Sequence, residues 1–132
     1  MNRKKEREQA FYLIFEKCFS NESVDNILEI AQECRDFITT DYIRTVFSGV
    51  YENVDEIDEV ISKHSTGWSI NRISKIALAI LRLAIFEINF LDEIPSSVSV
   101  NEAVELAKEF ASSEDASYVN GLLGAYIRSC KG

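Results

Sequence analysis

The chain has 132 residues, of which 46% are hydrophobic and 27% charged, with one proline and five glycines. A chain of this length can form one domain with a hydrophobic core. Because proline and glycine interrupt regular structure, their small number favours long helices or strands. The net charge of −8 argues against a broad basic face for nucleic acid, although it leaves room for a small basic patch. Three cysteines and a single histidine match no metal-ligand or disulfide spacing, so we expect free thiols, no metal and no cofactor.

Apolar residues recur at helical spacing throughout the first half. They predict helices at about 3–19, 24–37 (capped by Asn21 or Ser23) and 40–64. In the third helix the predicted buried stripe is Ile43, Val46, Phe47, Val50, Val54, Ile57, Val60 and Ile61. Gly49, in the middle of that stripe, is interpreted as a position where another helix packs closely.

The second half is organised around an apolar helix predicted at about 73–90. A polar break at 65–69 precedes it, where Trp68 is expected to pack as an anchor under the helix. The apolar run 76–91 is too short to cross a membrane, which takes about 20 residues, and it contains Arg82 and Glu87. We therefore expect a central helix surrounded by other helices, and no membrane segment or signal peptide.

Two further helices complete the predicted chain. Pro95 ends the apolar helix, and Ser99 with Glu102 has the spacing of a capping box for the next one. That helix would bury Val100, Ala103, Val104, Ala107 and Phe110, and the last helix would cover about 117–129. The expected fold is all-α, with six or seven helices in two small packed bundles around the central helix. The halves would be about 1–66 and 67–132 of one domain.

The pair Asn120-Gly121 is typical of a β-hairpin turn, but no strand pattern flanks it. A glycine inside a helix costs roughly 1 kcal/mol against alanine. We therefore interpret Gly121 as a close-packing position facing the preceding helix.

Known catalytic patterns are absent from the sequence: it has no GxSxG, HExxH, phosphate-binding glycine loop or CxxC. The acidic run around Asp55 and Asp58 is typical of a solvated helix face, and any nucleophile–histidine arrangement would depend on His64 alone. The sequence predicts no catalytic residue and a protein that is not an enzyme.

The stretch 80–121 closely resembles the C-terminal signature of the NusB family of transcription antitermination factors. That signature has an I-L-R-x-A-x-[YF]-E-[IL] helix, an I-P loop, a N-E-A-[VI]-E-L-A-K helix and then [FY]-V-N-G. The counterparts here are Ile80-Leu81-Arg82, Phe86-Glu87-Ile88, Ile94-Pro95, Asn101–Lys108 and Tyr118–Gly121. A weaker match extends to the N-terminal Arg7-Glu8-Gln9-Ala10, so the resemblance covers essentially the whole chain.

The resemblance implies an all-helical cytoplasmic protein that binds the boxA element of nascent ribosomal RNA transcripts. It would do so together with the ribosomal small-subunit protein NusE, within an RNA polymerase antitermination complex. The RNA-binding residues carried over are Arg3, Lys4, Lys5, Arg7 and Tyr118. Basic side chains neutralise phosphates and an aromatic ring stacks on bases, which suits single-stranded RNA. Without the resemblance, a solvated helix end and a half-buried core tyrosine would be the favoured interpretations.

The chain departs from the family pattern at two positions. Glu6 stands where members often have alanine, which weakens the local positive field, and Gly124 stands where they often have aspartate. We expect the Tyr118 ring to be partly exposed beside the basic first helix and Val119 to be buried. Two alternatives remain: a helical adaptor that binds only protein, and an accessory domain of an RNA methyltransferase, against which the lack of a following cofactor domain counts. A homodimer is left open.

Overall fold

The computed structural model describes residues 1–65 and 70–131, and every regular element in this part of the chain is helical. The helices are α1 (Arg3–Lys17), α2 (Val24–Cys34), α3 (Asp41–Glu52), α4 (Val54–His64), the short 3₁₀ helix η1 (Ile70–Arg72), α5 (Lys75–Phe90), α6 (Ser96–Phe110) and α7 (Ser113–Lys131). This confirms the all-α prediction. The prediction for Trp68 lies outside the described residues.

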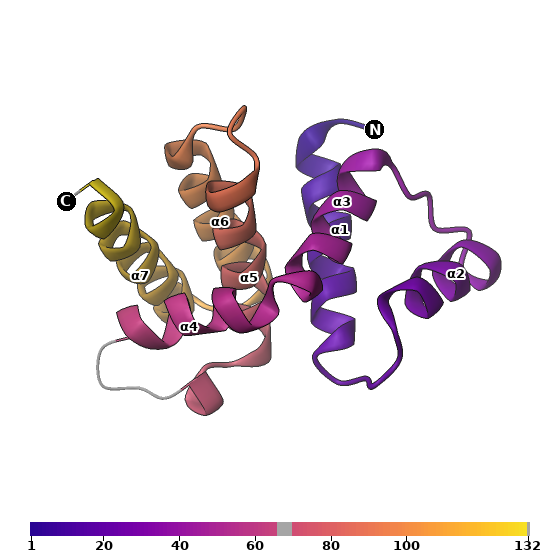
Figure 1. Cartoon of the computed structure of the whole chain (residues 1–132), viewed down its shortest axis with the longest axis horizontal. Helices are drawn as coiled ribbons and strands as arrows, with labels where there is room; N and C mark the ends of the chain where they lie inside the picture. The colour runs from indigo at the N-terminus through magenta and orange to yellow at the C-terminus, as the bar shows by residue number, and fades with distance from the viewer. Residues whose placement is uncertain (66–69, 132) are drawn as a thin grey trace.

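Helix α5 is the centre of the molecule. It contacts α1 and α3 on one side and α4, α6 and α7 on the other. Figure 1 shows α7 at one end of the molecule, then α6 and α5, then α1 and α3, with α2 at the far end. Ten of the 16 residues of α5 are buried, in an almost continuous run from Ala77 to Glu87, which explains the apolar sequence of this helix. Within the described ranges, no helix has both the length and the hydropathy to cross a membrane.

The predicted helix 40–64 is two helices, which corrects the sequence interpretation. Helix α3 ends at Glu52 and α4 begins at Val54. At the junction, both the backbone N–H and the side-chain amide of Asn53 donate to the carbonyl of Gly49, at 3.1 and 2.8 Å. Asparagine offers the backbone such local hydrogen bonds, which compete with helix continuation. The apolar stripe is nevertheless buried largely as predicted, from Ile43 to Ile61.

Gly49 and Gly121, two of the three glycines in the described helices, have different surroundings. A Cβ built on Gly49 would collide with the ring of Phe86, which confirms close packing of α3 against α5 there. A Cβ built on Gly121 would meet no atom within 4 Å, and the residue is exposed. The prediction that Gly121 lets α7 approach α6 is therefore wrong, because the glycine faces away from the helix contact.

Candidate nucleic-acid interface

The first turn of α1 carries three exposed cations. Asn2 caps the helix, its side chain accepting a hydrogen bond from the N–H of Lys5 at 2.9 Å. Arg3, Lys4 and Lys5 then project from the exposed end of the helix. Each lies near a carboxylate: Arg3 at 3.3 Å from Glu6, Lys4 at 3.7 Å from Glu102 and Lys5 at 3.7 Å from Glu8. Exposed pairs of this kind are weak, so an RNA phosphate can compete for these cations.

Arg7, the fourth predicted RNA contact, is buried. Its side chain is 5% exposed, its Nε donates to Glu87 at 2.8 Å, and its Nη1 lies 3.9 Å from Glu102. Burial by itself lowers the pKa of Arg7, but the hydrogen bond and charge of Glu87 outweigh it and raise the pKa. Arg7 therefore stays a cation inside the protein, where Glu87 and Glu102 hold its guanidinium and only 5% of the side chain is exposed to a phosphate.

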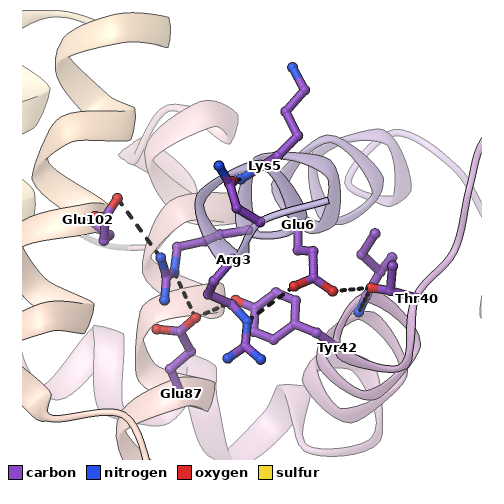
Figure 2. Close-up of polar contacts among 10 residues, drawn as sticks. Arg3, Lys5, Glu6, Thr40, Tyr42, Glu87 and Glu102 are labelled. Carbon is purple, nitrogen blue, oxygen red and sulfur yellow. Dashed lines mark hydrogen bonds and ion pairs between the residues drawn. The ribbon is translucent and has the colours of Figure 1, made fainter.

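Glu87 is the centre of a polar network inside the protein. Its carboxylate is fully buried and accepts hydrogen bonds from Arg7, from the Tyr42 hydroxyl and, at 2.8 Å, from the Ser99 hydroxyl. Figure 2 shows Tyr42 and Glu87 meeting below the first turn of α1. The network connects α1, α3, α5 and α6, and no buried side-chain nitrogen or oxygen of the described residues lacks a partner.

The role of Ser99 corrects the predicted capping box. Helix α6 begins at Ser96, after Pro95, so Ser99 is already inside the helix and its hydroxyl turns inward to Glu87. A signal for the network was present in the sequence, since Arg7 lies three and four positions before the buried Ala10 and Phe11. Glu87 likewise follows the buried Leu83 and Ala84. Opposite charges on two buried stripes indicate that the stripes meet.

Tyr118 lies apart from the basic first turn. It is half-buried on α7, beside the buried Val119, and its hydroxyl shares a hydrogen bond with that of Ser65 at the end of α4. In Figure 1, α5 and α6 separate α7 from α1. The partial exposure of Tyr118 and the burial of Val119 agree with expectation, but the expected position beside the first helix is wrong, because α7 packs on α6 and α4.

Hollows of unequal size lie along the surface between the two places. A hollow of only about 10 Å³ between α1 and α6 is lined by Lys4, Arg7 and Glu105. Glu105 also lines a groove of about 440 Å³ between α6 and α7, together with Lys108, Ser117 and Asn120. Ser117 in turn lines a groove of about 360 Å³ that contains Tyr118 and Arg128. We call this series of grooves, from Lys4 to Tyr118, the surface track.

The surface track is acidic in its first part. Four carboxylates line the groove between α1 and α6: Glu8, Glu102, Glu105 and Glu109. They repel phosphates, but a carboxylate can accept a hydrogen bond from the exocyclic amino group of a base. Cations lie beside the beginning of the track, at Arg3, Lys4 and Lys5. Lys108 lines its middle groove, and Arg128 lines the groove at its far end.

Known proteins share both this sequence and this fold. A family model described as the NusB family matches residues 4–128. The transcription antitermination protein NusB of Natranaerobius thermophilus is 45% identical over 128 residues, which cover 93% of this chain and 92% of the relative.

Two solved structures have closely similar folds. A T. maritima NusB structure matches with a TM-score of 0.86 and 30% identity, over 97% of this chain and 92% of that one. A structure described as the antitermination factors NusB and NusE in complex with dsRNA matches with a TM-score of 0.82 and 26% identity, over 96% of both chains. With a family model that spans nearly its whole length and a relative of this identity, the chain belongs to the NusB family.

Proposed function

We propose that this protein is a transcription antitermination factor that binds boxA-type single-stranded RNA together with NusE, within an RNA polymerase antitermination complex. Family membership supports the antitermination role, and the similar structure of NusB and NusE with RNA supports both partners. The single observation that carries RNA binding for this chain is the group of exposed cations in the first turn of α1, in a molecule of net charge −8.

In this proposal Arg3, Lys4 and Lys5 contact phosphates, and RNA follows the surface track toward Tyr118. The acidic part of the track would exclude the phosphate backbone and turn base edges toward Glu102 and Glu105. At the far end the Tyr118 ring would stack on a base, a contact worth about 1–3 kcal/mol. Arg7 would act from inside the protein, by fixing the first helix against Glu87.

The protein as a whole would work as one cytoplasmic domain without catalytic activity. Contacts of α5 with helices of both halves support a single domain. Among the described residues, no group of three or more His, Cys, Asp or Glu side chains could hold a metal ion. The three cysteines are free thiols, of which Cys34 and Cys130 are exposed.

Salt-dependent RNA binding tests the proposal. For each phosphate contact, the logarithm of the binding constant of a single strand falls by about 0.7 per logarithm of salt. Lys4→Ala and Lys5→Ala should each flatten the slope by about that amount. Arg35→Ala removes a cation that is 47% exposed and pairs with Glu16 near the C-terminal end of α1, away from the track, so it is the control and should leave the slope unchanged. Equal slopes for all four proteins would contradict the proposed interface.

Tyr118 requires a separate comparison, because its hydroxyl is already bonded to Ser65. Tyr118→Phe keeps the ring and should retain RNA affinity, whereas Tyr118→Ala should lose about 1–3 kcal/mol of binding free energy. If the alanine variant binds RNA normally while it is still folded, Tyr118 has only a structural role. Complete absence of RNA binding, with NusE binding intact, would instead favour a protein-only adaptor.

A further inference from the structure

The guanidinium of Arg3 lies over an aromatic ring of another helix. Its Cζ atom is 4.3 Å from the centroid of the Tyr42 ring, and Figure 2 shows the two side chains together beneath the first turn of α1. The Arg3 side chain is 47% exposed, whereas Tyr42 is 7% exposed. A guanidinium stacked on a ring uses its face, so its N–H groups remain available for hydrogen bonds at the edge.

One edge of that guanidinium is held by an acid. Nε of Arg3 donates to Glu6 at 3.3 Å, and Glu6 in turn accepts a hydrogen bond from the hydroxyl of Thr40, the residue that caps α3. Among the residues that the structure describes, none is bonded to the two Nη atoms of Arg3, which carry four of its five N–H donors. The free edge can therefore form the two parallel hydrogen bonds that a phosphate accepts.

The Tyr42 ring is in turn fixed from below. Its hydroxyl donates to the buried carboxylate of Glu87, which also holds Arg7 and Ser99. Burial, and then the charge of Glu87, raise the pKa of Tyr42, so the hydroxyl stays a donor at neutral pH. The orientation of the ring is thus determined by α1, α5 and α6 together.

The neighbouring lysines have no comparable support. The side chains of Lys4 and Lys5 are 68% and 57% exposed, and each lies 3.7 Å from one carboxylate. A long exposed side chain loses rotamer freedom when it binds a phosphate, and this loss weakens binding. For Arg3 part of that ordering has already taken place in the free protein.

We propose that Tyr42 is a positioning residue for RNA binding, which preorders Arg3 so that its free edge is presented to a phosphate. The inference depends on the RNA-binding function proposed above. It assigns a role to Tyr42, a buried residue of α3 that does not itself reach the surface track.

A double-mutant cycle tests this role. The binding of a labelled boxA-type single-stranded RNA is measured for the wild type, Arg3→Ala, Tyr42→Leu and the double variant, at a temperature where circular dichroism shows all four folded. Tyr42→Leu should lose about two- to fivefold in affinity, the range for an exposed cation–π contact. Arg3→Ala, which also removes the phosphate contact, should lose at least as much, and the double variant should lose little more than Arg3→Ala. Losses that multiply in the double variant would overturn the inference.

Two conservative variants separate positioning from stability. Tyr42→Phe loses the hydrogen bond to Glu87 and some stability, but it keeps the ring, so RNA affinity should stay within twofold of the wild type. Arg3→Lys keeps the charge but loses the planar guanidinium, so its RNA affinity should fall between those of the wild type and Arg3→Ala. Arg3→Lys at wild-type affinity would overturn the inference even if Tyr42→Leu does not fold.

The same measurements distinguish the two proposals. If Arg3→Ala binds RNA like the wild type, Arg3 is no contact and the inference fails. Lys4→Ala, Lys5→Ala and Tyr118→Ala then report independently on the proposed interface. If none of these variants changes RNA binding, both proposals fail together.

Discussion

Arg7 and Glu87 are 80 positions apart in the chain and form an ion pair inside the protein, with 2.8 Å between Nε and Oε2. Arg7 comes from the basic N-terminal segment, which the sequence suggests is exposed, and Glu87 comes from the most apolar helix. The pair attaches the first turns of α1 to the centre of the molecule. Of the four N-terminal cations, Arg7 therefore stabilises the fold, whereas Arg3, Lys4 and Lys5 face solvent.

Removing one partner of this pair should be costly. We expect Arg7→Ala to lower the free energy of unfolding by about 3–5 kcal/mol, because it leaves Glu87 buried without its charged partner. Arg7→Met combined with Glu87→Gln should cost less than the sum of the two single changes. Urea unfolding measures all of these, with Lys5→Ala as an exposed control that should change stability by about 0.5 kcal/mol or less. A small effect of Arg7→Ala would mean that the pair contributes little.

Gly49 and Gly121 should respond in opposite directions to replacement by alanine. Gly49→Ala places a methyl group against the Phe86 ring and should destabilise by roughly 1–3 kcal/mol through overpacking. Gly121→Ala adds a methyl group in open space and should stabilise by about 0.5–1 kcal/mol, because alanine loses less conformational entropy in a helix. Thermal unfolding of both variants checks this. Destabilisation by Gly121→Ala would show that its surroundings are more crowded than the structure indicates.

Glu6 should limit RNA affinity. It lies 3.3 Å from Arg3 and reduces the positive field at the end of α1. Glu6→Gln removes the charge but keeps an oxygen that can accept from Thr40. We expect about two- to fivefold tighter RNA binding at low salt, corresponding to an exposed ion pair of roughly 0.5–1 kcal/mol. The gain should disappear at high salt, as binding isotherms at two salt concentrations would show. A gain that persists at high salt would rule out this electrostatic explanation.

Alkaline pH should destabilise the protein partly through Tyr42. Burial and Glu87 raise the pKa of Tyr42 in the folded state above the value of about 10 in the unfolded chain. Above pH of about 10 the unfolded chain has lost this proton and the folded protein retains it, so the free energy of unfolding falls as pH rises. Tyr42→Phe should flatten this fall by up to about 1.4 kcal/mol per pH unit. Urea unfolding over a series of alkaline pH values measures the slope. Identical slopes for both proteins would contradict the prediction.

NusE should strengthen RNA binding. A partner that carries positive charge would fit a chain of net charge −8 whose own cationic surface is small. We expect NusE to raise RNA affinity at least tenfold, equivalent to about 1.4 kcal/mol of coupling free energy. Linkage requires RNA to tighten NusE binding by the same factor. Calorimetric titrations in both orders of addition measure the two affinities. If each ligand binds with the same affinity whether or not the other is present, the sites are independent and the prediction is wrong.

The sequence by itself determined the helical class, most of the buried stripe and the central helix, because helical periodicity is a local property of residues three and four positions apart. It also contained the family signature. It did not show the break at Asn53, where a side-chain hydrogen bond to Gly49 competes with the helix. That competition depends on a small local balance of free energies.

Only the tertiary structure decided which candidate residues share a surface. Helical periodicity places Arg7 on the buried side of α1, but it does not show that Glu87 lies opposite. Without that partner the burial of a charged side chain would be too costly, so periodicity alone does not predict it. In the same way, the sequence predicted that Gly121 contacts α6 and that Tyr118 lies beside α1, and both predictions are wrong. Their surroundings depend on how α7 packs against α4 and α6. A helix's sequence specifies which face is buried, whereas the elements that cover that face are set by the packing of the whole chain.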